Sequence, residues 1–502
     1  MNKRTTQEQI NHALWAAWNN LQGIFNLSEH RNYIIVFLFL KYLSDNWKDR
    51  FEDCKKRYGT DNEMINRKMN RERFVLPGNC TFDYLYEHRN DPDIGEKIDE
   101  VLAKIEDRNL DKLKDLFHNI SFNSEKLGLT KNRNLRLKTL ITDFANPVLD
   151  FRPSIRGSET NHAGNACIYL IEKFSLENEN SGRAFYTPRK VSEVLARLIA
   201  PHPGARICDP TCGSGSLLIT VAEHVTDETG ESSPDYALYG QEINGDTLVL
   251  AKLNMFLHGL DASNLEWCDT INNPMLLEGN KLMKFDAVVA HPPFSIDKWD
   301  FEGAMKDRFK RFLRGIPPKG KGDYAFILHI INILLPSGKA GVIVPHGVLF
   351  RSGSEEKIRQ ALIEDNLLDA VIGLPTNLFF GTGIPASILI FSKSRKTSDV
   401  LFIDASHEYQ EGKKQNILRM QDMDKIIDAY ESYEIIAKYA YRATFDELKK
   451  NDFNLNIPRY VETYKEEEPV DIKATQKEIE KLEGELEGVG KELNKYLKEF
   501  GF

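Results

Sequence analysis

Hydrophobic side chains recur every three or four residues along the first third of the chain, which is the period of one helix face. Two stretches show the pattern clearly: Leu14, Trp15, Trp18, Leu21 and Phe25, and then Ile98, Val101, Leu102 and Ile105. The pattern predicts a helical N-terminal domain over 1–172, with the charged stretch 55–73 as a loop. The most apolar run, 33–40, is far shorter than the ~20 residues that span a bilayer. It therefore predicts a buried helix and no membrane contact.

Near residue 175 the pattern changes to short apolar strands that alternate with amphipathic helices, which is typical of a doubly wound α/β fold. The predicted helices cover 189–200, 215–225, 244–258, 323–335 and 354–364. The predicted strands cover 205–208, 237–240, 285–290, 340–345, 368–373, 387–391 and 400–404. We therefore expect one α/β domain over 173–406, followed by a mixed extension over 407–465.

The last segment, 466–502, begins with an acidic hinge and continues with a heptad pattern. Its apolar positions step alternately by 3 and 4: Ile479, Leu482, Leu486, Val489, Leu493, Tyr496 and Phe500. This apolar seam predicts a coiled-coil-like helix that packs either on its own domain or on another subunit. Glycines at 484, 488 and 490 weaken the isolated helix by about 1 kcal/mol each, so we expect docking to order it.

Charge and cysteine content narrow the class of protein. The formal net charge is −9, from 66 Lys and Arg against 75 Asp and Glu, so bulk charge cannot hold a nucleic acid. Six cysteines without a CxxC pair, and without a His or Cys cluster nearby, predict neither a structural metal nor disulfides. The polar N-terminus carries no export signal, and these features together favour a cytoplasmic protein.

A glycine-containing loop between a predicted strand and a predicted helix is the first chemical motif. It contains Asp209, Gly213, Ser214 and Gly215, and glycines at such a turn let a ligand approach the backbone and the helix N-terminus. A dinucleotide-binding loop has a third glycine, and this chain has Leu218 there. The loop therefore suits a nucleoside-like ligand.

Two acids follow this loop in the order that a nucleoside site requires. Glu242 ends the next predicted strand, where an acid binds ribose hydroxyls. Asp269 precedes a predicted turn, where a carboxylate could accept a hydrogen bond from an exocyclic adenine amine. Each acid alone is more typical of a helix cap or a loop, and their order behind the glycine loop favours the binding site.

The last predicted strand of this unit, 285–290, runs into His291, Pro292, Pro293 and Phe294. Consecutive prolines remove backbone donors and leave carbonyls that only accept hydrogen bonds. A side chain and a carbonyl held in this way can accept both hydrogens of a planar amino group. Phe294 offers a face on which an extruded base can stack.

With these motifs, the sequence resembles the adenine-specific N6 DNA methyltransferases, and more narrowly the modification subunits of type I restriction-modification systems. The resemblance covers nearly the whole chain and rests on 39–45, 185–188, 209–216, 291–294, 318–319, 323–326, 338–350 and 454–460. It implies a Rossmann-like domain that binds S-adenosyl-L-methionine. It also implies DNA, a specificity subunit, a second modification subunit and a restriction subunit as partners. The C-terminal seam is then the expected contact with the specificity subunit.

The resemblance also implies residue roles. Phe185, Tyr186, Thr187, Pro188, Asp209 and the 213–215 loop would hold the cofactor, with Glu242 at its ribose and Asp269 at its adenine. The family places Asn before the two prolines, and this chain has His291. A neutral imidazole accepts one hydrogen bond and a protonated one accepts none. An active variant, a pH-dependent enzyme and a non-methylating subunit therefore all remain open.

A basic segment at 305–322 supplies the local positive charge that the whole chain lacks. It holds seven basic residues against one acid, a net charge of +6. Arg308, Lys310, Arg311 and Arg314 are its expected contacts with DNA phosphates, and a solvated helix face is the alternative. Three other functions stay open: methylation of RNA or a protein amide, a non-catalytic scaffold, and an NAD-dependent oxidoreductase. The missing third glycine argues against the last of these.

Overall fold

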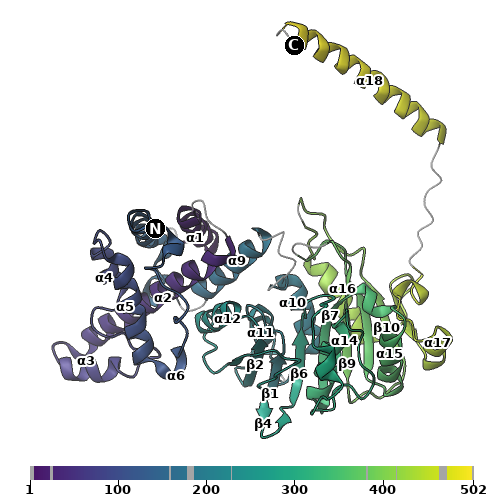
Figure 1. Ribbon diagram of the computed structural model, residues 1–502, viewed down its shortest axis with the longest axis horizontal. Helices are drawn as coiled ribbons and strands as arrows, with labels where there is room; N and C mark the ends of the chain where they lie inside the picture. The colour runs from purple at the N-terminus through teal and green to yellow at the C-terminus, as the bar shows by residue number, and fades with distance from the viewer. Residues whose placement is uncertain are drawn as a thin grey trace. The chain divides into compact units, whose positions relative to one another are not determined.

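The chain forms two units in the computed structural model, Met1–Val461 and Glu462–Phe502. The structure describes residues 5–22, 27–157, 160–177, 186–227, 229–379, 383–413, 415–462 and 472–499. The first unit joins a helical N-terminal part to an α/β part (Figure 1). The second contains a single long helix, α18 (Ile472–Glu499).

The helical N-terminal part confirms the predicted periodicity. Its helices are α1 (Gln7–Gln22), α2 (Leu27–Tyr58), α3 (Asn62–Met69), α4 (Phe82–Glu87), α5 (Ile94–Arg108), α6 (Leu110–Leu113), α7 (Thr130–Phe144), α8 (Pro153–Arg156) and α9 (His162–Glu177). The apolar run 33–40 lies buried within α2, as predicted. The stretch 55–73, predicted as a loop, is largely helical, because α2 continues to Tyr58 and α3 buries Ile65 and Met69.

A nine-stranded sheet in the order β11-β10-β8-β9-β7-β6-β1-β2-β3 forms the centre of the α/β part. Its strands are β1 (Ala205–Asp209), β2 (Tyr236–Glu242), β3 (Asn264–Trp267), β6 (Phe285–Ala290), β7 (Leu334–Pro345), β8 (Leu368–Gly373), β9 (Ala386–Ser392), β10 (Val400–Asp404) and β11 (Ala440–Ala443). Pairing is parallel except for β9, which runs antiparallel to β7 and β8, and β11, which runs antiparallel to β10. A separate hairpin joins β4 (Leu277–Glu278) to β5 (Lys281–Leu282).

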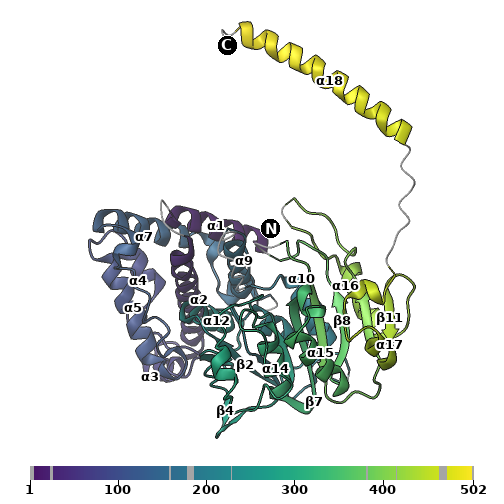
Figure 2. The same ribbon diagram turned by 45° about the vertical axis from the view of Figure 1, so that its right-hand side comes forward.

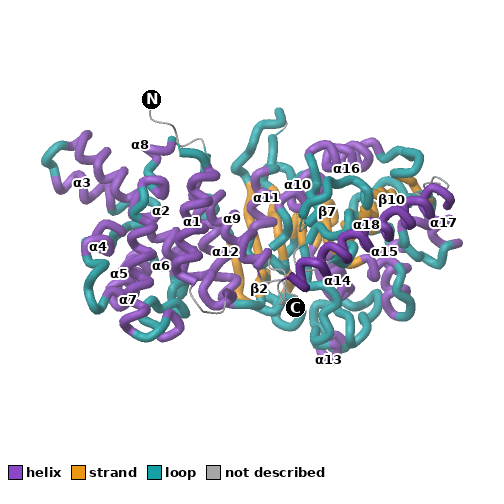
Figure 3. Tube along the Cα trace, turned by 90° about the horizontal axis from the view of Figure 1, so that it is seen from above, coloured by secondary structure: helices purple, strands orange, loops and turns teal. Residues whose placement is uncertain are grey.

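Helices cover both faces of this sheet, which confirms the predicted doubly wound α/β fold. They are α10 (Arg189–Ile199), α11 (Ser216–Glu223), α12 (Gly245–Leu257), α13 (Phe301–Ala304), α14 (Asp323–Ile333), α15 (Ser354–Glu364), α16 (Met420–Ser432) and α17 (Phe445–Lys450). Figure 3 shows α10 and α16 on one face and α14 and α15 on the other. All seven predicted strands form, and two further strands, β3 and β11, join them.

The segment 407–465, expected as a separate extension, contributes to the main sheet. Its strand β11 pairs with β10 from Val400↔Ala443 to Ile403↔Ala440. Tyr460 stacks on Phe402 of β10, with ring centroids 4.0 Å apart and an interplanar angle of 17°. The expected boundary near 406 therefore does not separate two domains.

The helical part docks on the α/β part where α2 packs against α12 (Figure 2). Phe39 stacks on Phe256 with ring centroids 5.9 Å apart. Beside this contact, Arg31 Nη2 donates to Thr247 Oγ1 at 3.1 Å, and Asn32 Nδ2 donates to the Asp246 carbonyl at 3.2 Å. The start of α2 is thus fixed against the start of α12, directly after the end of β2.

Helix α18 leaves its apolar seam uncovered within its own unit. The seam residues that the structure describes are each more than half exposed: Ile479, Leu482, Leu486, Val489, Leu493 and Tyr496. Phe500, the last predicted seam position, lies outside the described residues. Across the described ranges, no helix has the length and apolarity needed to cross a membrane.

Candidate active site

The glycine loop follows β1 and leads into α11, as its sequence predicts. Gly213 and Gly215 have φ of +52° and +75°, in the left-handed region that favours glycine. A Cβ on Gly215 would stand 3.1 Å from Met255 Cε, because α12 packs closely behind the loop. The backbone amide of Cys212 donates to the Gln241 carbonyl at 2.9 Å and ties the loop to β2. Ser214, which lies between the two glycines of the predicted loop, is buried.

Glu242 at the end of β2 faces this loop. Its Oε2 accepts from Gly213 N at 3.1 Å and its Oε1 accepts from Asn244 N at 2.8 Å. Burial raises the pKa of Glu242, while these backbone donors and the Arg31 guanidinium oppose the shift. Each carboxylate oxygen has a further lone pair, so the side chain suits a ligand with hydroxyl donors.

Asp209 and Asp269 are held by local turns. Asp209 Oδ1 accepts from Thr211 N at 2.9 Å, and burial raises the pKa of Asp209 to about 7. Asp269 Oδ1 accepts from Ile271 N at 2.9 Å, and its Oδ2 accepts from Asn272 Nδ2 at 2.8 Å. Both aspartates therefore shape the loops after β1 and β3, whatever ligand those loops hold.

Gln241 is a site residue that sequence reasoning missed. Its buried Nε2 donates to Thr270 Oγ1 at 3.0 Å, and its Oε1 accepts from Met275 N at 2.9 Å and Leu276 N at 3.2 Å. The Thr270 hydroxyl in turn donates to the Pro210 carbonyl. One amide side chain thus joins the end of β2 to the loop after β3 and, through Thr270, to the loop after β1. A polar residue directly before Glu242 at a strand end was the available signal.

His291 begins the turn after β6 and lies beside Thr187. The two residues are 104 positions apart in sequence, and Thr187 Oγ1 lies 3.0 Å from His291 Nδ1. Burial lowers the pKa of His291 to about 4, so the imidazole is neutral at physiological pH. The structure thereby brings the predicted 185–188 and 291–294 motifs together.

Phe294 and Phe379 pack around the His291 ring. The centroids of the His291 and Phe294 rings are 5.2 Å apart, and those of His291 and Phe379 are 5.1 Å apart. Phe379, which is 3% exposed, comes from the loop after β8 and was not predicted. Its only sequence signal is an apolar pair next to a Gly-Thr-Gly run.

A buried ion cluster fixes the backbone after Phe294. Ser295 N donates to Asp323 Oδ1 at 2.7 Å, and Ser295 has a φ of +50°. Arg351 bridges Asp323 and Glu355, with an N–O distance of 2.9 Å to each. Burial raises the pKa of Glu355 to about 7. This cluster sets the course of the chain beyond the two prolines.

The other residues of the 185–188 motif lie at the start of α10. Tyr186 is buried, and Pro188 is the N-cap of α10. Phe185 lies outside the described residues. Pro292 is buried and Pro293 is exposed in the turn after β6.

The basic segment 305–322 forms turns and loops. The alternative that its cations lie on a solvated helix face is therefore wrong. Arg311 corrects another expectation, because it is buried and cannot reach a phosphate. It pairs with Asp307 at 2.8 Å and donates to the Thr270 and Ile271 carbonyls at 3.1 and 2.6 Å. Arg314 pairs with Asp365 at 2.6 Å. Arg308 and Lys310 are exposed.

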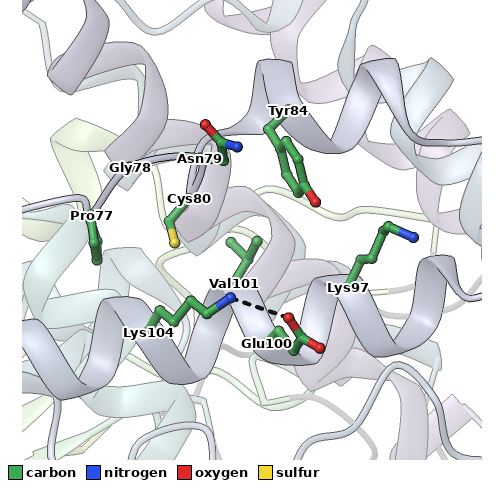
Figure 4. A pocket seen from close by; sticks show the side chains of 9 residues that line it. All are labelled: Pro77, Gly78, Asn79, Cys80, Tyr84, Lys97, Glu100, Val101 and Lys104. Carbon is green, nitrogen blue, oxygen red and sulfur yellow. Dashed lines mark hydrogen bonds and ion pairs between the residues drawn. The ribbon is translucent and has the colours of Figure 1, made fainter.

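A depression of about 370 Å³ lies in the helical part, between the loop before α4 and helix α5 (Figure 4). The Lys104–Glu100 ion pair, with an N–O distance of 3.2 Å, crosses one side of it. Burial raises the pKa of the Cys80 thiol in its wall, so this cysteine is a poor nucleophile. None of the predicted site residues line this depression.

Two family models match this sequence. The model for N-6 DNA methylases matches residues 158–469. The model for the HsdM N-terminal domain matches residues 10–144. The two matches together span the helical part and the α/β part.

Individual proteins are similar over most of their length. The type I restriction enzyme MpnII methylase subunit of Mycoplasma pneumoniae is 30% identical, over 96% of this chain and 94% of its own. The MjaVIII methylase subunit of Methanocaldococcus jannaschii is 32% identical, over 90% of this chain and 78% of its own. The crystal structure of a type I restriction-modification methyltransferase subunit from Streptococcus thermophilus has a TM-score of 0.79 and 32% identity, and covers 91% of this chain and 100% of its own.

The buried Arg311–Asp307 pair gives a stability prediction. Arg311→Ala leaves the Asp307 carboxylate buried without its cation and frees two backbone carbonyls, so we expect a loss of about 3–5 kcal/mol in the free energy of unfolding. Exposed Arg308→Ala and Lys310→Ala should change it by less than about 0.5 kcal/mol. Chemical denaturation of the three variants measures this. Equal, small effects for all three would show that Arg311 is not part of the core.

Proposed function

The chain belongs to the N-6 DNA methylase family as a modification subunit of the type I restriction-modification kind, and from this premise we propose how it acts. The reaction is transfer of a methyl group from S-adenosyl-L-methionine to the exocyclic N6 of an adenine turned out of the DNA duplex. His291 occupies the position that receives the amino group. The observation that carries this proposal is the place of His291 in the turn directly after β6, where its ring packs against Phe294 and Phe379 and burial lowers its pKa.

The carboxyl edge of the sheet fits S-adenosyl-L-methionine. Gly213 and Gly215 adopt positive φ, so the loop turns tightly between β1 and the start of α11. Glu242 supplies carboxylate lone pairs for ribose hydroxyls, and Asp269 stands in the next loop toward the adenine. Thr187 and Pro188 border the proposed cofactor site beside His291. The bound cofactor supplies an electrophilic methyl group on a sulfonium centre.

The chain's own residues orient the amino group. Nε2 of neutral His291 accepts one N6 hydrogen, and a carbonyl of the proline turn accepts the other. With both hydrogens engaged in the plane of the base, the nitrogen lone pair points out of that plane toward the methyl group. S-adenosyl-L-methionine held by the 213–215 loop, Glu242 and Asp269 would supply the methyl group as the electrophile, and the proton lost from N6 would pass to solvent. Positioning and electrostatics supply the acceleration.

His291 therefore decides activity and its pH dependence. We expect His291→Ala to slow methyl transfer by about 10²-fold or more, and His291→Asn, a carboxamide acceptor, to stay within about tenfold of the parent. Protonation turns Nε2 into a donor, so activity is lost as pH falls through the lowered pKa near 4. Between about pH 6 and about pH 8 the rate should not follow His291 titration.

Labelled methyl incorporation into DNA by the assembled complex, measured across pH, checks this. Calorimetric cofactor binding by each variant is the control for folding. An acid limb near pH 6.5 in the parent that disappears in His291→Asn would contradict the lowered pKa of His291. Full activity of His291→Ala would contradict the neutral-acceptor mechanism.

Exposed cations of the basic segment are proposed to contact DNA phosphates. Arg308 and Lys310 are exposed, and Gly322 at the end of the segment donates to the Ile296 carbonyl at 2.9 Å, close to the catalytic turn. Arg311 supports this surface from within by binding Asp307. Short-range contacts of this kind reconcile a chain of net charge −9 with a polyanionic substrate.

Replacing Lys306, Arg308 and Lys310 together by Ala should reduce the slope of log affinity against log salt by about 0.9 for each phosphate that these cations neutralise in the parent. DNA binding by the assembled complex at several salt concentrations measures the slope. The matched control replaces Lys55, Lys56 and Arg57, which are exposed at the end of α2, and should leave it unchanged. The same slope for both triple variants would contradict the proposed phosphate contacts.

The specificity subunit is proposed to dock on the seam of α18. Six described apolar side chains along one heptad stripe stay exposed in their own unit, and such a stripe is buried by a partner helix. The flanking ion pairs Lys481–Glu485 and Lys491–Glu487 lie within the same helix, which suits positions outside a seam. DNA, a second modification subunit and a restriction subunit complete the proposed complex, which we place in the cytoplasm.

Leu486→Glu with Leu493→Glu should abolish copurification of the specificity subunit, because charges would be buried in the seam. The control, Lys481→Ala with Lys491→Ala, should copurify as the parent does. The unfolding of the 1–461 unit should not change in either variant. Intact assembly of the double Glu variant would rule out the seam as the contact.

An RNA or protein-amide methyltransferase is the second candidate, since the His291 turn suits any planar amino group. Methyl incorporation into RNA or protein, with none into DNA, would favour it.

A further inference from the structure

The contact between Thr187 and His291 engages one of the two imidazole nitrogens. Thr187 Oγ1 lies 3.0 Å from Nδ1, and among the described residues no other hydrogen-bond partner of the imidazole is found. Thr187 is 6% exposed, so water does not readily replace its hydroxyl. The other ring nitrogen, Nε2, is not engaged by Thr187, and it is the nitrogen at which the amino group of the substrate is proposed to bind.

The ring cannot easily turn over, which would put Cδ2 in place of Nδ1 beside Thr187. Phe294 and Phe379 pack against it with interplanar angles of 60° and 54°. Thr187 is fixed as well, because it precedes Pro188, which restricts its backbone to the extended region. Pro188 is also the N-cap of α10, and Tyr186, which directly precedes Thr187, is 2% exposed.

A neutral imidazole carries one proton, and only one tautomer can serve the reaction. With the proton on Nδ1, Nε2 has a lone pair and accepts an amino hydrogen. With the proton on Nε2, two donors face one another and the amino group is turned away. The productive tautomer therefore needs an acceptor for a buried Nδ1–H, and a hydroxyl oxygen is such an acceptor.

We propose that Thr187 is a positioning residue that accepts the Nδ1–H of His291 and so keeps Nε2 free to accept the substrate amino group. This inference rests on the proposed function of His291. It gives Thr187 a role that a residue contacting only the cofactor would not have. It also explains why histidine needs a partner here, because a carboxamide has a permanent acceptor oxygen and needs none.

The test is a double-mutant cycle of Thr187→Val with His291→Asn in the assembled complex. Valine keeps the shape of threonine and removes the acceptor. With His291 present, Thr187→Val should lower kcat by about tenfold or more, since a buried Nδ1–H loses its partner. Thr187→Ser keeps a hydroxyl and should stay within about threefold of the parent. With Asn at position 291, Thr187→Val should lower kcat by a clearly smaller factor, since only a contact with the cofactor can then be lost.

A second readout follows the proton directly. Nitrogen NMR of ¹⁵N-histidine protein, in complex with the demethylated cofactor product and DNA, distinguishes a protonated from an unprotonated ring nitrogen. The His291 signals are identified by their loss in His291→Asn. We expect a protonated Nδ1 and an unprotonated Nε2, with the opposite tautomer or a mixture in Thr187→Val.

The outcomes separate this proposal from the one on which it rests. An equal loss of kcat from Thr187→Val in both backgrounds would overturn the tautomer role and assign Thr187 to cofactor binding or folding. Unchanged kcat in Thr187→Val, with His291→Ala inactive, would overturn only the role of Thr187. Full activity of His291→Ala would overturn the proposed function of His291 itself.

Discussion

The buried amide of Gln241 holds together the edge of the sheet on which the site is built. Its side chain binds Thr270, Met275 and Leu276, and Thr270 binds the carbonyl of Pro210, so the end of β2 and the loops after β1 and β3 are fixed to one another. The carboxylate of Glu242, the next residue, accepts from the amide of Gly213. Because a buried amide left without partners is costly, the positions of these three segments are strongly coupled.

The same network reaches the proposed DNA-facing loop and the helical part. Arg311 binds the carbonyls of Thr270 and Ile271, so the basic segment is attached to the loop that carries Asp269. On the other side, Arg31 contacts Thr247 at the start of α12, directly after the Glu242 strand end. The turn that carries His291 is held independently, by Asp323 at Ser295 N and by the aromatic rings around His291. The proposed cofactor site and the proposed base site thus have separate anchors and meet at Thr187 and His291.

Much of the fold could be predicted because the central strands are continuous apolar runs buried on both faces. Strand β3, at the sheet edge, is four residues long, with an exposed Trp267, and β11 is equally short, so neither gives a clear pattern. The order of the motifs predicted that Glu242 and His291 lie at one edge of the sheet, because the carboxyl ends of parallel strands share that edge. Arg311 was misassigned because a charge count cannot tell a buried ion pair from an exposed cation. The partners of Gln241 and the packing of Phe379 depend on loops distant in sequence, which no local pattern encodes.

The central claim is that a neutral His291 receives the substrate amine where the family has a carboxamide. The most direct measurement is a structure of the assembled complex with a non-reactive cofactor analogue and target DNA. The account predicts an extruded adenine whose N6 lies about 3 Å from His291 Nε2, with Nδ1 still on Thr187. An adenine seated beside the cofactor with its N6 out of hydrogen-bond reach of His291 would contradict it.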